Sequence, residues 1–307
     1  MQRMDYDAIA RHFLVPTGPA PALIEPPSTA ARRLRDACEA VATIGWWSRP
    51  AAVGFLGLGH DFFDGYVWGR AAALGPWVSA PVVVAAFGVF DRAMLTAVFE
   101  HGRSISSHDA ILSARAAGAS AGLAAATADV DVTLVEAFGD RLLVASDSLD
   151  GLGRPLFGAL RGLPIPDDAH GRAWRAAELV REHRGDGHIA ALVAAGLDMA
   201  EANVLTEVWL GYPPGEYSAS RGFAPERLRA AADALRTRGW FDASDTLTVA
   251  GRAARDDIEA TTDRSQQGLI DALGDDLSTV IAQGTALTEA VLRAQAAPAD
   301  PRKRAAG

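Results

Sequence analysis

Apolar residues recur every three or four positions through most of the first 190 residues, and alternating β-branched residues are scarce. This period predicts helices rather than strands. Ser28 and Thr29 suit the cap of a helix over residues 30–47. Glycines across residues 51–70 predict two short helices or one helix broken near 57–59. Further helices are expected over residues 82–90, 107–125 and 131–149.

Glycine and proline interrupt this pattern between residues 151 and 166, which predicts a domain boundary near residue 150. Beyond it, a helix is expected over 167–184, ended by the glycines at 185 and 187. Two more, over 188–195 and 199–210, flank a break at Gly196, and together they have a helix-turn-helix outline.

The remaining segments complete a pattern typical of a winged helix. Pro225 at a first turn predicts a helix ending at Gly239, and residues 240–249 suit a short β-hairpin. Helices over 250–264 and 275–296 follow. We therefore expect a mainly α protein, with a helical bundle domain over residues 1–150, a winged-helix-like domain with a β-wing over 151–297, and a disordered tail over 298–307.

Composition places the chain among soluble globular proteins. Of its 307 residues, 49% are hydrophobic and 22% charged, and the formal net charge is -9. Cys38 is the only cysteine, which excludes an intramolecular disulfide and suits a reducing compartment. No secretion signal or apolar run long enough to span a membrane is visible, so we expect a cytoplasmic protein. Positive charge comes almost wholly from arginine, a bias typical of the GC-rich genomes of actinobacteria.

The most concentrated chemistry is the run Arg-Glu-His-Arg-Gly-Asp-Gly-His over residues 181–188. If a turn at the glycines reverses the backbone, its two imidazoles converge on one corner between helices. Such a corner suits general acid–base catalysis or the binding of an anion. The candidate catalytic residues are His183, His188, Asp186 and Glu182, and the candidate ligand-binding residues are Arg181, Arg184, Arg154 and Trp174.

Two other interpretations of this run stay open. A metal site is disfavoured, because the spacing differs from the two-histidine arrangement of H-E-x-x-H. The second interpretation is structural, with Asp186 capping a helix, the histidines satisfying carbonyl groups and Arg184 paired with a carboxylate. The sequence carries no nucleotide, dinucleotide or serine-hydrolase motif, so no cofactor is indicated.

Charge disfavours DNA as a partner, because phosphate contacts need lysine or arginine. Between Arg184 and Arg221 the chain has no lysine or arginine but five carboxylates. Residues 225–264 hold seven arginines against eight carboxylates, and two of these carboxylates lie in the expected wing. A winged helix that binds DNA through this face is therefore not favoured.

The chain resembles a large actinobacterial family of proteins labelled helix-turn-helix. The resemblance is most specific at residues 154–157 and 163–166, at Trp174, and over 181–188. It implies a helical N-terminal domain and a winged-helix-like C-terminal domain, and a shared feature made by Glu182, His183, Asp186 and His188. One departure is the absence of a histidine from residues 42–47, where relatives carry one before an aromatic pair.

Two functions follow as expectations. The first is a small-molecule-binding protein or enzyme of actinobacterial metabolism, with His183 or His188 as acid or base. Whether that metabolism is primary or specialised stays open. The alternative is a ligand-responsive winged-helix transcriptional regulator. Because winged-helix modules and terminal helices often pair, a homodimer is plausible, whereas a membrane partner is not expected.

Overall fold

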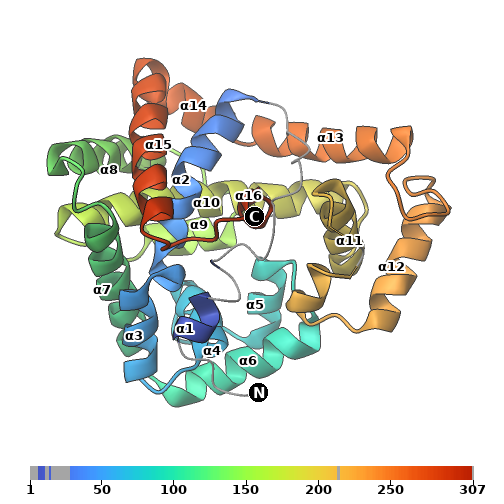
Figure 1. Ribbon diagram of the computed structural model, residues 1–307, viewed down its shortest axis with the longest axis horizontal. Coiled ribbons are helices and arrows are strands. Elements are labelled where there is room, and N and C mark those ends of the chain that lie inside the picture. Colours follow the sequence, from blue (N-terminus) through green and yellow to red (C-terminus); the bar gives the residue numbers. More distant parts are fainter. Residues whose placement is uncertain (1–5, 11–13, 15–27, 213–214, 306–307) are drawn as a thin grey trace.

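The computed structural model describes residues 6–10, 14, 28–212 and 215–305, and most of them are helical (Figure 1). The first half contains α1 (Tyr6–Ile9), α2 (Ala30–Trp47), α3 (Arg49–Gly57), α4 (Phe62–Ala71), η2 (Ala72–Leu74), α5 (Ala80–Phe87), α6 (Arg92–Ile105), α7 (His108–Ala126) and α8 (Val132–Asp147). The second half contains α9 (Pro155–Arg161), α10 (Ala169–Ala194), α11 (Met199–Trp209), η3 (Ser218–Arg221), α12 (Pro225–Thr237), α13 (Val249–Arg264), α14 (Gln267–Leu273), η4 (Gly274–Asp276), α15 (Leu277–Arg293) and α16 (Pro301–Ala305).

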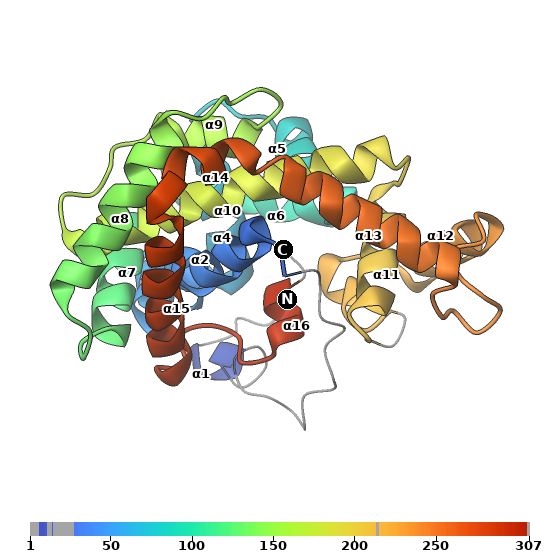
Figure 2. The same cartoon turned by 90° about the horizontal axis from the view of Figure 1, so that it is seen from above.

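The long helix α10 is the axis of the molecule. It runs through the middle and packs against α8, α2, α7, α13 and α9 (Figures 1 and 2). The helices α11, α12 and α13 gather at its C-terminal end, on the side opposite α8 and α15. Any side chain on the central turns of α10 is therefore enclosed by other helices.

The largest hydrophobic cluster surrounds the first half of α10. Leu34, Phe138, Trp174 and Val291 all belong to it and are at most 1% exposed. These residues come from both sides of residue 150, where a domain boundary was expected from glycine and proline alone. The boundary stays a prediction, and burial of this shared apolar surface links the two halves.

The predicted start of the helix at residue 30 and the helix-turn-helix outline are confirmed. Thr29 caps α2 by accepting a hydrogen bond from the Arg32 N–H, and α2 spans the expected residues 30–47. Asp198 and Glu201 form a capping box at the start of α11. Gly196 has a φ of +69°, which ends α10 in a left-handed turn and bends α11 by 107° from it.

The expected β-wing is wrong. In the described part of the chain there is no β-strand, and residues 240–248 contribute one isolated bridge between Phe241 and Leu247. The side chain of Asp242 accepts from the N–H groups of Ser244 and Thr246, so the segment closes as a side-chain-capped turn. Thr248 is already the cap of α13, which leaves too few residues for a strand pair. The winged-helix assignment of the C-terminal half is therefore not supported.

The expected break at residues 185–187 is also wrong, because α10 continues unbroken from residue 169 to residue 194. Gly187 lies where α10 and the end of α13 are closest, and a Cβ there would collide with the side chains of Ser265 and Arg154. The glycine therefore serves close helix packing rather than a turn. As a result, His188 follows His183 on one helix instead of facing it across a corner.

The end of the chain differs from expectation as well. Residues 301–305 form α16, which packs against α2, where a disordered tail was expected. Arg35 of α2 donates a hydrogen bond to the main-chain oxygen of Arg304. Separately, no single helix among the described residues is long and apolar enough to cross a membrane, although α10 and α11 pass the same test as a bent pair.

Close packing of α3 on α7 predicts a specific sensitivity at Gly118. A Cβ at this position would lie 2.6 Å from the Cα of Ala51, so Gly118→Ala should lower the free energy of unfolding by about 1–3 kcal/mol. Gly158, in α9, has no such neighbour within 4 Å, and Gly158→Ala should stabilise by up to about 1 kcal/mol. Urea denaturation of both variants checks this, and equal effects would contradict the packing argument.

Candidate functional site

The arginines and the glutamate of the 181–188 run are paired with charges from other helices. Glu182 accepts two hydrogen bonds from the guanidinium of Arg70 in α4, at 3.0 and 2.7 Å. Arg181 bridges Glu182, at 2.8 Å, and Glu39 of α2, at 3.3 Å. On the next turn, Arg184 pairs with Glu259 of α13 at 2.9 Å. The sequence motif is thus the middle of a larger network.

Ion pairs connect these residues into one continuous array, which we call the buried charge chain. From Glu39 it passes through Arg35, Asp36 and Arg32 of α2 to Glu259, which also receives Arg255. Most of these side chains are buried, Asp36 being about half exposed. In order, the members are Arg70, Glu182, Arg181, Glu39, Arg35, Asp36, Arg32 and Glu259, with Arg184, Asp263 and Arg255 joined at Glu259.

The buried charge chain holds six arginines and five carboxylates, so its formal charge is one unit positive. A buried charge is tolerated only when it is paired and hydrogen-bonded, because removal from water is expensive. A surplus guanidinium among buried pairs therefore favours an additional anion.

The pKa values in the buried charge chain follow this pairing. Burial alone would raise the pKa of Glu182, but Arg70 and Arg181 lower it to about 2. Burial would likewise lower the pKa of Arg181, and Glu39 with Glu182 raises it instead. Burial lowers the pKa of Arg32, and the neighbouring Arg35 adds to that effect. The pKa of Arg255 is lowered in the same direction, so at both Arg32 and Arg255 the surrounding carboxylates do not fully offset the cost of burial.

The two histidines each have a partner at the end of α13. His183 lies 2.9 Å from the Gln266 side-chain oxygen, and its ring packs edge-on against Phe157. His188 lies 2.9 Å from the Thr262 hydroxyl. Burial lowers the pKa of His183 to about 4 and that of His188 to about 3, so both imidazoles are neutral at pH 7.

Asp186 and Arg154 connect α10 to other segments. The Asp186 carboxyl accepts from the Phe157 N–H at 3.0 Å, so it satisfies a free donor in the first turn of α9 rather than capping a second helix. Burial raises the pKa of Asp186 to about 7. Arg154 donates to the main-chain oxygens of His183 and Ser265. These contacts hold α9, α10 and the end of α13 together.

Trp174 is a core residue. Its side chain is fully buried in the largest hydrophobic cluster, and its indole N–H donates to the Ala42 carbonyl at 3.1 Å. One turn further along α10, Glu178 is shared by the buried guanidinium groups of Arg115 and Arg175. This second group of charges also has more arginines than carboxylates.

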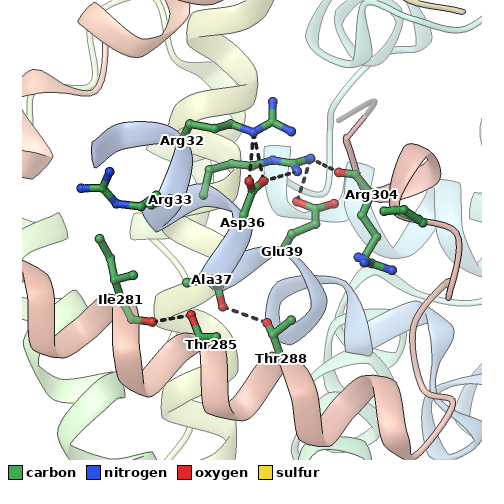
Figure 3. Close-up of a pocket in the computed structure, with 11 residues that line it drawn as sticks. Arg32, Arg33, Asp36, Ala37, Glu39, Ile281, Thr285, Thr288 and Arg304 are labelled. Atoms are coloured by element: carbon green, nitrogen blue, oxygen red, sulfur yellow. Dashed lines mark hydrogen bonds and ion pairs between the residues drawn. The ribbon is translucent and has the colours of Figure 1, made fainter. Parts of the chain in front are cut away.

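A cavity of about 400 Å³ lies beside the buried charge chain, between α2, α15 and α16 (Figure 3). We call it the arginine-lined cavity. It is bordered by four arginines and two carboxylates, together with two threonines of α15. These are Arg32, Arg33, Arg35, Arg304, Asp36, Glu39, Thr285 and Thr288.

The candidate residues on α10 lie behind this cavity rather than on its wall. Arg181 reaches it through Glu39, and Arg184 reaches it through Glu259 and Arg32. His183, His188, Asp186, Glu182, Arg154 and Trp174 line neither this cavity nor a second one of about 550 Å³ between α1, α3 and α7. Their catalytic and ligand-binding roles stay predictions.

The residues that the sequence analysis missed lie on α2 and α13. Arg32, Arg35 and Glu39 recur at a spacing of three and four, which places them on one face of a helix. That spacing could have identified the shared face. It does not indicate burial, because a row of charges on a helix is also typical of a solvent-exposed face.

The face of α12 that would approach DNA carries no unpaired arginine within the described residues. Arg227 pairs with Asp198 at 2.5 Å, and Arg229 pairs with Glu226 at 3.0 Å. Arg236 binds Asp233 and Asp245, and Arg238 binds Glu201 at 3.2 Å. Carboxylates therefore already neutralise the arginines that phosphate groups would need.

Comparison with known proteins identifies a family. A model of a protein family described as a helix-turn-helix family covers residues 31–298. No curated protein and no solved structure matches the chain. Within the described residues, no group of three or more His, Cys, Asp or Glu side chains is placed to hold a metal ion.

The shared position of Glu259 predicts a large cost for its neutralisation. Glu259→Gln leaves Arg32, Arg184 and Arg255 without their common carboxylate, so the free energy of unfolding should fall by about 3–5 kcal/mol. Glu226→Gln is a matched control, because that carboxylate is exposed and pairs with Arg229 at the surface; it should leave the free energy of unfolding nearly unchanged. Urea denaturation at pH 7 measures the free energy of unfolding of both variants. Small and similar losses would contradict the stabilising role of the buried charge chain.

Burial of His188 predicts acid sensitivity. Its pKa is about 3 in the folded protein but near 6.5 when unfolded, so acidification below pH 6.5 favours unfolding by up to about 1.4 kcal/mol per pH unit. His188→Gln removes this contribution. The stability lost between about pH 7 and pH 5 should therefore be smaller in the variant than in the wild type. His170→Gln, on the first turn of α10, is the control. If His188→Gln loses as much stability between about pH 7 and pH 5 as the wild type, His188 is not the source of the acid sensitivity.

Proposed function

The chain belongs to the helix-turn-helix family, and we propose that on this scaffold it binds a small molecule in the arginine-lined cavity. One observation carries the proposal. The cavity borders the part of the buried charge chain where Arg32 is incompletely compensated, so a cavity and a charge that needs a partner coincide. A volume of about 400 Å³ lies in the range of small-ligand sites.

The remaining residues of the 181–188 run have a supporting role in this proposal. Arg181 and Arg184 hold Glu39 and Glu259, and these carboxylates in turn orient Arg35 and Arg32 at the cavity. The proposal concerns binding and does not require turnover. Acid–base catalysis by His183 or His188, a place in actinobacterial metabolism, a cytoplasmic location and a homodimer stay predictions.

A ligand-responsive regulator is the second candidate, because the family is a helix-turn-helix family. In this version the small molecule binds in the same cavity and α12 contacts DNA. DNA binding by α12 is disfavoured because its nearby arginines would have to exchange their carboxylate partners for phosphates. These arginines are Arg227, Arg229, Arg236 and Arg238. Small-molecule binding without DNA binding is therefore the function that the geometry supports best.

Native mass spectrometry of the purified protein tests the proposal. We expect a stoichiometric small-molecule adduct that survives gentle ionisation. Thr285→Trp fills the cavity from the exposed side of α15 and should abolish the adduct, whereas Ala282→Trp, on the same helix but outside the cavity, should retain it. A protein without adduct that binds DNA with a strong salt dependence would contradict the proposal and favour the regulator.

A further inference from the structure

The chemistry of the ligand follows from the arrangement of charges around the arginine-lined cavity. Arg33 lies at one end beside Ile281, whereas Arg32 is turned toward the end where Arg304 lies (Figure 3). Arg35 joins that second end by its hydrogen bond to the Arg304 main-chain oxygen. Three arginines therefore gather at the end formed by α2 and α16, where Asp36 and Glu39 offset two of their charges.

Arg32, which lines the cavity, has a donor without a hydrogen-bond partner among the described residues. Its side chain is 5% exposed, and its Nη1 atom has no hydrogen-bond partner in the described part of the chain. Glu259 Oε2 lies 3.5 Å away and already accepts from Arg184 at 2.9 Å. A buried guanidinium with a free N–H group is a strong donor to the oxygens of a carboxylate or a phosphate.

The walls limit the size and the body of the ligand. Ala37, Ile281 and Pro301 give the cavity apolar surface, and the hydroxyl groups of Thr285 and Thr288 lie between them along α15. A volume of about 400 Å³ suits a short organic body rather than a long chain or a polymer. Four arginines against two carboxylates on the border disfavour a cation.

We propose that the arginine-lined cavity takes a small organic anion whose carboxylate or phosphate group accepts hydrogen bonds from Arg32 at the end closed by α16. The inference rests on the proposed function and adds the chemical class of the ligand. The anion supplies the negative charge that the buried charge chain lacks, and its short apolar body lies against Ile281 and Pro301.

Isothermal titration calorimetry with succinate, inorganic phosphate and putrescine tests the charge and distinguishes the two anion types. We expect one anion to bind and putrescine to bind negligibly. Arg32→Gln should weaken anion binding at least about tenfold, the loss of one charge-assisted hydrogen bond. Asp36→Asn should tighten it, because a carboxylate on the cavity border is removed.

The test must also separate a loss of anion binding from a loss of folding. Arg32→Gln leaves five arginines facing five carboxylates, so it should fold with a melting temperature near that of the wild type. Arg304 lies on the partly buried α16, and Arg304→Gln should weaken anion binding. Arg293→Gln, outside the cavity, should leave anion binding unchanged. If both Arg32→Gln and Arg304→Gln leave anion binding unchanged, the anion does not bind in the arginine-lined cavity and the inference is overturned.

The outcomes separate the inference from the proposed function. The inference that the ligand is an anion is overturned if putrescine binds and neither anion does, or if the native adduct is neutral or cationic. Either result leaves the proposal of small-molecule binding intact. No adduct in the native spectrum and no binding of any of the three probes overturns both.

Discussion

The fold depends on the buried charge chain that links α4, α10, α2 and α13. Its ion pairs fix the rotation of α10, because Glu182 must face Arg70 while Arg184, two residues later and on nearly the opposite face of the helix, must face Glu259. Hydrophobic side chains tolerate small rotations and repacking, whereas an unpaired buried charge does not. The apolar core therefore supplies the burial, and the buried charge chain specifies the register in which the four helices meet.

Local signals were sufficient for most of the helices. Thr29 and Gly196 are a cap and a break whose effects act within four residues, and the structure uses both as predicted. The errors occur where tertiary contacts override a local preference. Gly187 is a helix breaker by propensity, but in α10 it provides the space that Ser265 needs, so the helix continues. Residues 240–248 have the composition of a hairpin, yet Asp242 and Thr248 close and cap the segment locally.

The candidate site was predicted only in part, for a related reason. The 181–188 run is dense in charge, so its importance is visible in the sequence, but its partners Glu39 and Glu259 lie more than 70 residues away in both directions. Whether Arg32 is a solvent-exposed or a buried residue depends on α15 and α16 folding over α2. The second of these helices was expected to be disordered. The cavity could therefore not be inferred before the structure.

The distribution of arginine distinguishes the interior from the surface of α12. On α12 each arginine is balanced by a nearby carboxylate, whereas the buried charge chain retains an arginine in excess beside the arginine-lined cavity. The central claim is that this excess is matched by a bound anion. Crystals soaked in selenate test it directly, because the selenium position appears in an anomalous difference map. The account predicts a peak within hydrogen-bond distance of the Arg32 guanidinium. Peaks confined to exposed arginines such as Arg293, with none in the cavity, would contradict it.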